Sequence, residues 1–378
     1  MLNIGDGQGG LTGEHLTTQD KLHLRIIATL AVVMSVLGYT LHNTYGIDEP
    51  AWPWVLATFA LATLLFVTPA RWYDMPIPRP LRSTLNTPWF WLLLATALNF
   101  TVLLFGFEYQ GARYTFGNEA VSIRSSLLST MAVIVFFALW QARYTTNTTS
   151  KIWQEGSLIV LLWCNLLLLL IQPDLFIIPF WLLLFVLVGQ KLKGLLGRSM
   201  QLTSLAFVVG GAWLLLNSPY RLERLIGGWI NYADNPYGSG YQLNQSLEAL
   251  RLGGWFGNEV AGYNEQVLLP VDTTAFAVPM LAYWLGMVSI ILMVGLIAGF
   301  AWSLWKLRSN RLGVVRYVLG GLLGLYLYNH IIVLGVPMGA LPLFGQPLGL
   351  AFIGAGAVHG VLILAIIFLS FRYGSKNV

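Results

Sequence analysis

Residues 235–257 read NPYGSGYQLNQSLEALRLGGWFG, a polar and glycine-rich run inside a chain that is 56% hydrophobic and only 10% charged. Soluble domains carry about 25% charged residues. The apolar residues here come in blocks long enough to cross the ~30 Å hydrocarbon core of a bilayer. The composition therefore predicts an all-α polytopic membrane protein, in which the quoted run lies in a long loop outside the membrane.

Outward from this loop, the apolar blocks predict ten transmembrane helices, seven before the loop and three after it. The apolar block 157–171 is followed by Pro173, which fits a helix end. Only a tight turn separates it from the next predicted helix. The expected spans are 24–43, 52–69, 89–107, 125–142, 157–171, 175–190, 202–217, 276–304, 313–334 and 348–371.

The distribution of Lys and Arg predicts the orientation, because these residues are retained on the cytoplasmic side. With ten spans, 16 of the 21 basic residues fall on the side of the two termini. Eleven of the 16 acidic residues fall on the other side. We therefore expect both termini in the cytoplasm and the loop outside it. The expected divisions are a cytoplasmic tail 1–23, helices one to seven in 24–217, an extracytoplasmic loop 218–275, helices eight to ten in 276–372 and a cytoplasmic tail 373–378.

Several classes of function are excluded by the same sequence. The single cysteine, Cys164, rules out an internal disulfide and a thiolate metal cluster. The net charge of +5 follows from membrane sidedness, so it does not indicate nucleic-acid binding. The loop contains six Trp, Tyr and Phe residues between 229 and 256, too many for a disordered linker. We expect it to fold back over the helices as a cap.

The motifs of the loop resemble those of the SEDS family, which includes RodA, FtsW and SpoVE. They are SPYRLERL at 218–225, PYGSGYQLNQS at 236–246 and GGWFG at 253–257. The QPDL turn at 172–175, and the pattern of Asn329, Gly335, Pro337 and Gly339, are also similar to family segments. The resemblance covers most of the chain beyond residue 20.

The resemblance implies a peptidoglycan glycosyltransferase of cell elongation or division in the bacterial cytoplasmic membrane. Such an enzyme polymerises lipid II, releases polyprenyl pyrophosphate and acts with a class B penicillin-binding protein. The chemistry requires a general base for the acceptor hydroxyl, and cationic groups or a divalent cation for the pyrophosphate. No cofactor is assigned from the residues, and the need for a cation stays open. Membrane lipids, and no nucleic acid, complete the expected partners.

The charged positions of the family are largely replaced in this chain. Thr274 occupies the position of the family's catalytic Asp, and Asp272 is the neighbouring acid that could act as a substitute base. The family's acid and lysine near the start of the fourth span are absent from residues 125–130, which read SSLLST. A charge at membrane depth costs ~2.5–3.5 kcal/mol on insertion scales, so its loss stabilises the helices when catalysis is not required.

The candidate catalytic residue is therefore Asp272, and the alternative for it is an exposed loop carboxylate. Arg221 and Arg224 are candidates to hold pyrophosphate; they could equally pair with lipid phosphate, as could Arg113. We expect Tyr241 and Gln242 on a short helix, where they either contact substrate or bond the loop backbone. Asn329 lies at mid-span, where a bond between helices competes with a role in substrate binding. For Asp174 after its proline, we expect a helix cap.

Three functions remain open at this point. The first is the glycosyltransferase. The second is a catalytically inactive SEDS paralogue that binds lipid-linked precursor or a penicillin-binding protein as a regulator or scaffold. The third is a lipid-precursor transporter, for which the sequence offers no charge relay across the membrane.

Overall fold

The structure of the chain is a computed structural model. It describes residues 16–45, 52–67, 79–109, 112–117, 122–144, 152–172, 174–192, 194–234, 236–258, 273–342, 348–353 and 356–374.

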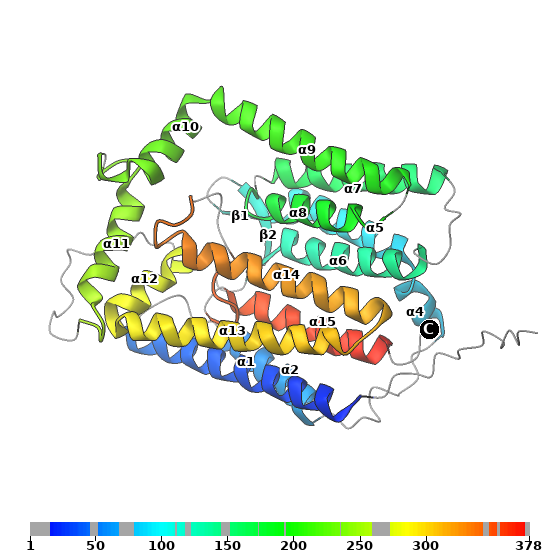
Figure 1. Cartoon of the computed structure of the whole chain (residues 1–378), viewed down its shortest axis with the longest axis horizontal. Helices are drawn as coiled ribbons and strands as arrows, with labels where there is room; N and C mark the ends of the chain where they lie inside the picture. Colours follow the sequence, from blue (N-terminus) through cyan, green and yellow to red (C-terminus); the bar gives the residue numbers. More distant parts are fainter. Residues whose placement is uncertain are drawn as a thin grey trace, which may run out of the picture.

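The described residues fold mainly as helices that run side by side in a bundle (Figure 1). The longer helices are α1 (Thr18–Tyr45), α2 (Trp52–Val67), α5 (Pro88–Phe105), α6 (Ser125–Tyr144), α7 (Ile152–Ile171), α8 (Ile177–Gly189), α9 (Leu195–Leu216), α13 (Met287–Ser309), α14 (Gly313–Gly335) and α15 (Ala357–Gly374). The shorter ones are α4 (Arg79–Leu85), α10 (Pro219–Leu225), a π-helix η1 (Ile226–Ile230), a 3-10 helix η2 (Tyr232–Asp234), α11 (Tyr241–Gly253) and α12 (Thr273–Leu285).

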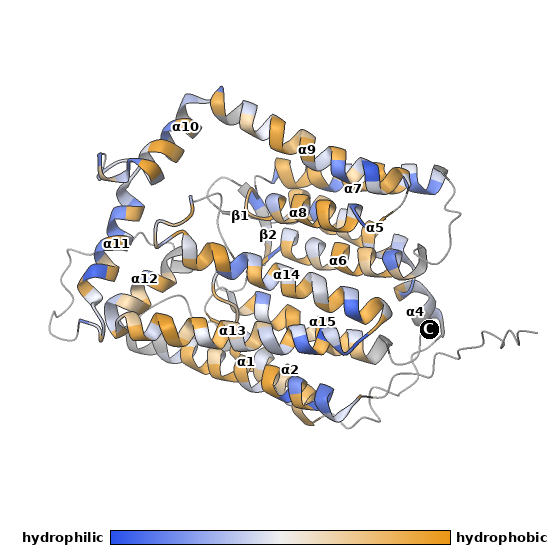
Figure 2. Cartoon of the chain, in the orientation of Figure 1, coloured by the Kyte–Doolittle hydropathy of each residue, from blue (hydrophilic) through white to orange (hydrophobic). Residues whose placement is uncertain are grey.

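Hydrophobic residues cover the bundle helices over most of their length (Figure 2). Within the described residues, six helices are long and apolar enough to cross a membrane, and three more apolar helices are shorter. The six are Thr18–Thr40, Pro88–Phe105, Ser125–Ala142, Trp153–Ile171, Met287–Ser309 and Gly313–Gly335. The fold is therefore that of a multi-pass membrane protein.

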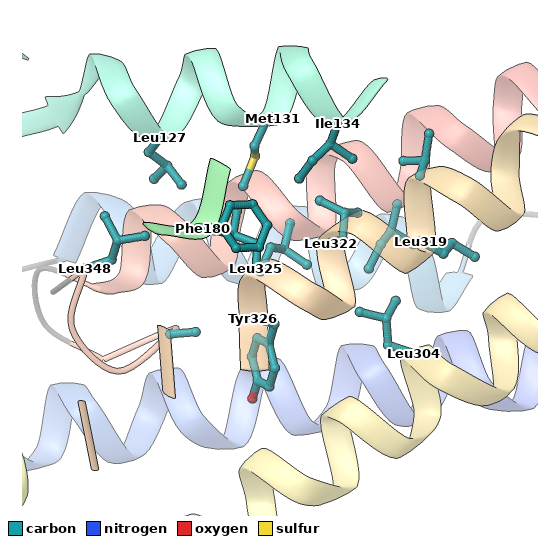
Figure 3. Packing of buried hydrophobic residues seen from close by; sticks show 14 of the residues in the cluster. Leu127, Met131, Ile134, Phe180, Leu304, Leu319, Leu322, Leu325, Tyr326 and Leu348 are labelled. Atoms are coloured by element: carbon teal, nitrogen blue, oxygen red, sulfur yellow. The ribbon is translucent and has the colours of Figure 1, made fainter. Parts of the chain in front are cut away.

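The core of the bundle lies around α6, of which 83% of the span Ser125–Ala142 is buried. The middle of this helix, from Met131 to Trp140, is wholly apolar, which suits its central position. Figure 3 shows Leu127, Met131 and Ile134 of α6 pointing toward the side chains of α14. The backbone of α14 also comes close to an α6 side chain, since a Cβ at Gly321 would lie 2.4 Å from Cγ2 of Ile134.

The structure departs from the expected spans at two positions after the loop. The expected helix 276–304 is divided into α12 and α13 at Gly286, which has φ +77°. Hydropathy alone misses this break, because the apolar run continues through the glycine. The expected span 348–371 begins later, at Ala357, since residues 348–353 are not helical.

The expectation of an all-α chain also misses a small antiparallel sheet between α5 and α6. It is formed by β1 (Phe107–Tyr109), β2 (Ala112–Gly117) and β3 (Ser122–Arg124), in the order β1-β2-β3. β2 carries aromatic and β-branched residues, which favour strands, but it is too short to register beside the long apolar blocks. β3 leads directly into α6 and so fixes where this central helix begins.

The two ends of the bundle are built differently. At one end, a buried ion pair between Asp20 and Arg311 joins the start of α1 to the turn between α13 and α14. At the other end, α10 and α11 run across the bundle from α9 to α12 (Figure 1). The candidate site residues that the structure describes on α10 and α11 lie at this second end.

Candidate functional site

Residues 219–258, which we call the lid, are fixed to the bundle by side-chain hydrogen bonds. Trp229 Nε1 donates to the Gly339 carbonyl at 2.8 Å, and Ser246 Oγ donates to the Pro337 carbonyl at 2.7 Å. Both acceptors follow the end of α14, so the same short segment holds the lid at two points. Ser246 therefore bonds a backbone group of the bundle rather than one of the lid.

Helix α11 forms the docked face of the lid. Its buried residues are Leu243, Ser246, Ala249 and Gly253, which recur at the spacing of one helix face. This face packs against α12, where a Cβ at Gly253 would lie 1.9 Å from the Ala282 carbonyl oxygen. Only glycine permits this approach of the two backbones.

The predicted substrate-binding residues of the lid lie on these helices. Tyr241 and Gln242 occupy the first turn of α11 and are half-buried. Arg221 and Arg224 lie on α10, and their side chains fall outside the described part of the structure. The predicted base Asp272 also falls outside the described residues. Thr274 lies in the first turn of α12, and its side chain is likewise not described.

A buried carboxylate lies at the same end of the bundle. Asp174 is 7% exposed and accepts a hydrogen bond from Ser126 Oγ of α6. The helix cap expected for Asp174 is wrong, because α8 begins at Ile177, its N-cap is Phe176, and no side-chain capping bond is made there. Asp174 instead ties the turn between α7 and α8 to the start of α6.

A chain of buried amides continues from this point into the bundle. Ser125 Oγ donates to Gln172 Oε1 at 2.9 Å, and Gln172 Nε2 donates to the Asn99 carbonyl at 2.8 Å. Asn99 Nδ2 donates to Asn165 Oδ1 at 3.0 Å, and Asn165 Nδ2 donates to Thr96 Oγ1 at 2.7 Å. These bonds link α5, α6 and α7 through polar side chains.

This chain of amides was not among the sites predicted from the sequence. Asn99 and Asn165 are each fully buried within apolar helices. Polar residues at membrane depth are costly and generally mark a structural or functional bond. Their position in otherwise apolar spans is therefore the sequence feature from which buried hydrogen bonds could have been predicted.

Asn329 lies on α14 and bonds a segment that follows α14 in the chain. Its Nδ2 donates to the Gly349 carbonyl at 2.6 Å, and its Oδ1 accepts from the Leu348 backbone N–H at 3.1 Å. The neighbouring His330 accepts from the Ala351 N–H at Nε2, 3.2 Å away. The expected bond between helices is thus replaced by bonds to the non-helical residues 348–351.

The structure therefore places the predicted residues in separate elements at one end of the bundle. Arg113 lies on β2, opposite Glu108 of β1, and its side chain is exposed. Tyr241, Gln242 and the two lid arginines lie on α10 and α11, and Asn329 lies beneath on α14.

The exposed face of α11 carries an ion pair. Arg251 donates to Glu248 at 2.9 and 2.6 Å through two guanidinium nitrogens. The hydrogen bonds from Arg251 hold the pKa of the Glu248 carboxyl below its ordinary value. Among the described residues, no group of three or more His, Cys, Asp or Glu side chains is arranged to hold a metal ion.

A buried carboxylate can orient a hydroxyl, and Asp174 holds the hydroxyl of Ser126 in this way. The lid crosses this end of the bundle and is bonded to the segment after α14 (Figure 1).

Comparisons with known proteins agree with the fold. Residues 19–376 match the family model of the FtsW, RodA and SpoVE cell cycle proteins. A probable peptidoglycan glycosyltransferase FtsW of Buchnera aphidicola is 28% identical over 300 residues, covering 76% of this chain and 77% of the relative.

Solved structures are similar over nearly the whole chain. A chain of a peptidoglycan synthase complex, studied for its coordination of polymerization and crosslinking, superposes with a TM-score of 0.63 at 21% identity. That match covers 93% of this chain and 98% of the other. The rod shape-determining protein RodA of Thermus thermophilus superposes with a TM-score of 0.56 at 19% identity, covering 93% and 97%. These likenesses show a shared fold.

Proposed function

The chain belongs to the FtsW, RodA and SpoVE family of cell cycle proteins, the SEDS family, and from this membership we propose that it polymerises peptidoglycan glycan strands in the bacterial cytoplasmic membrane. The substrate is lipid II, and the reaction releases polyprenyl pyrophosphate. The observation that carries this proposal is the family match over residues 19–376, together with an ordered lid at one end of the bundle.

The proposed topology has ten membrane passes, formed by α1, α2, α5 to α9 and α13 to α15. Both termini lie in the cytoplasm, and the lid lies outside it. The geometry supports this arrangement, because the lid contacts the start of α13 and the Asp20–Arg311 pair lies at its far end. Cysteine accessibility at exposed Tyr237, in a Cys164→Ser background, tests the side of the lid.

In the proposed site, Asp272 is the general base, and Arg221, Arg224 and Arg113 hold the pyrophosphate. Tyr241, Gln242 and Asn329 contact the lipid-linked sugars or position the backbone that does. A class B penicillin-binding protein is the proposed partner. The similarity to a chain of a peptidoglycan synthase complex supports that pairing.

The test is polymerisation of fluorescent lipid II by the purified protein in nanodiscs, alone and with the candidate partner. We expect glycan strands from the unmodified protein and none from Asp272→Asn. Asp234→Asn is the matched control, since Asp234 is an exposed acid of the same lid on η2. Equal activity of both variants would remove Asp272 from the mechanism.

One observation favours a second candidate, an inactive paralogue that binds lipid-linked precursor or a penicillin-binding protein. The start of α6 presents uncharged hydroxyls whose bonds stay within the protein: Ser129 and Thr130 donate to the Ser126 carbonyl. Thr130 also accepts from Trp181 Nε1 at 2.8 Å. Absence of glycan product, combined with retained binding of lipid II, would select this second function.

A further inference from the structure

The lid ends in a turn that is bound to the first residues of a membrane span. The backbone N–H groups of Met287 and Val288 donate to the carbonyls of Gly254 and Trp255, at 2.9 and 3.3 Å. Asn258 N–H donates to the Tyr283 carbonyl at 3.0 Å. These three bonds fix the turn to both sides of the break between α12 and α13.

Glycines make this contact closer than other residues would allow. A Cβ at Gly286 would lie 2.2 Å from the Trp255 carbonyl oxygen, and a Cβ at Gly257 would lie 2.0 Å from the Trp284 carbonyl oxygen. Both glycines have positive φ, +77° and +91°, which L side chains rarely adopt. Backbone packing therefore fixes the turn next to the first residues of α13.

The side chains of this turn point away from the protein. Trp255 is 65% exposed and Phe256 is 82% exposed. The helix whose start bonds this turn also exposes apolar side chains: Ile291 and Leu292 of α13 are 59% and 64% exposed. α13 is a candidate membrane span from its first residue, Met287.

These positions place the aromatic pair at the depth where α13 enters the bilayer. A helix rises about 1.5 Å per residue, so Met287 to Leu292 covers only the first ~8 Å of the span. Trp and other amphipathic aromatic residues concentrate at this boundary, because one part of the ring is apolar and another reaches polar headgroups.

We propose that Trp255 and Phe256 insert into the boundary between headgroups and acyl chains and anchor the end of the lid to the bilayer. The partner of this surface is the lipid of the outer boundary, continuous with the lipid around α13. The lid is then held both by the protein and by the membrane. Trp229 and Ser246 bind it to the segment after α14, and backbone bonds hold its end to α12 and α13. The aromatic pair binds it to the lipid. This anchor is independent of catalytic activity.

Site-directed spin labelling in nanodiscs of phosphatidylcholine and phosphatidylglycerol tests the anchor. A nitroxide is attached at Phe256→Cys in a Cys164→Ser background, and its collisions with oxygen and with a water-soluble nickel chelate are measured. The matched control is Tyr237→Cys, since Tyr237 is an aromatic residue of the same lid and is 92% exposed, but lies before α11. The same label at both positions cancels any preference of the probe for lipid.

We expect oxygen to exceed the nickel chelate in accessibility at position 256, with the reverse at position 237. Water exposure at both positions would overturn the proposal and would point to a protein surface for the aromatic pair. If Phe256→Cys fails to fold, Leu252→Cys carries the label beside the native pair, as Leu252 is 38% exposed. At that position, Trp255→Ser with Phe256→Ser is expected to raise nickel accessibility at least severalfold, and an unchanged value would equally overturn the anchor.

Discussion

Two buried histidines, His330 of α14 and His359 of α15, differ in how their ring nitrogens are bonded. Since Nε2 of His330 accepts from the Ala351 N–H, its Nδ1 carries the hydrogen and donates to the Tyr326 carbonyl at 2.7 Å. Neither ring nitrogen of His359 has a hydrogen-bond partner among the described residues, although the side chain is 1% exposed. The imidazole of His330 is therefore expected to stabilise the folded protein, and the buried imidazole of His359 to destabilise it.

We expect His330→Leu to lower the thermal midpoint of the detergent-purified protein and His359→Leu to leave it equal or raise it. The first change strands the Ala351 N–H, which costs ~1–3 kcal/mol, whereas the second removes buried polar atoms that lack partners. Unfolding is followed by the loss of monodisperse protein after heating. A fall of similar size in both variants would show that His359 is bonded by residues beyond the described ranges.

For single residues, the sequence predicts which buried side chains need hydrogen bonds better than it predicts their bonding partners. Asn329 and His330 stand out as polar residues in an apolar helix, but a bond across helices was the expected outcome. Asn329 instead bonds Leu348 and Gly349, and His330 bonds Ala351 as well as Tyr326 of its own helix. Hydropathy assigns residues 348–351 to a helix. The partner of a side chain depends on where the chain turns, and a local pattern does not contain that information.

Among the elements, α11 depends on a backbone contact that tolerates no side chain. Gly253→Ala places a Cβ 1.9 Å from the Ala282 carbonyl oxygen, so α11 and α12 must separate. Such overpacking costs ~1–3 kcal/mol. We expect faster tryptic cleavage after the exposed Arg251, detected by mass spectrometry of the fragments.

Gly211→Ala is the control for that substitution. Gly211 lies on α9, and a Cβ there has no described atom within 4 Å. Alanine favours a helix over glycine by about 1 kcal/mol, so this variant should match the unmodified protein in cleavage. Equal cleavage of all three proteins would mean that the lid docks without the close approach at Gly253.

The ion pair on α11 predicts a dependence of the lid on pH. The folded-state pKa of Glu248 lies below its ordinary value of 4.5, so the pair stabilises α11 above about that pH. The stabilisation is lost as the pH falls through the lower, folded-state pKa. We expect backbone amides of α11 to exchange about twofold faster at acidic pH, after correction for intrinsic rates. Glu248→Gln should abolish this difference, and a variant that keeps it would assign the effect to another group.

The boundaries of the elements show which parts of the fold follow from the local sequence alone. The expected spans 125–142 and 313–334 agree closely with α6 and α14, because long apolar runs decide them. The break at Gly286 escapes prediction, since its cause is the Trp255 carbonyl of the lid, 31 positions earlier in the sequence. Residues 348–351 likewise depend on bonds beyond their own stretch of sequence, which come from the side chains of Asn329 and His330.

On the scale of the whole molecule, the Asp20–Arg311 pair joins elements from both ends of the chain. The guanidinium and carboxylate are 2.7 Å apart, with side chains only 6% and 0% exposed. Arg311 also lies over the Phe371 ring of α15, 4.9 Å from its centroid. Removing one partner of a buried ion pair costs ~3–5 kcal/mol, whereas replacing both is often close to neutral.

We therefore expect Asp20→Asn and Arg311→Met each to lower the thermal midpoint strongly, and the double variant to recover much of the loss. Asparagine keeps an oxygen that can still accept from Thr17, whose N–H and Oγ1 bond Asp20 at 3.0 and 2.7 Å. The control cycle is Glu248→Gln with Arg251→Met, an exposed pair in which salt bridges contribute little. If the thermal midpoint of the Asp20 and Arg311 double variant falls by the sum of the two single decreases, the two charges act separately. In that case, packing of α1 against α13 and of α15 against α2 and α14, rather than this pair, would close the bundle at the end opposite the lid.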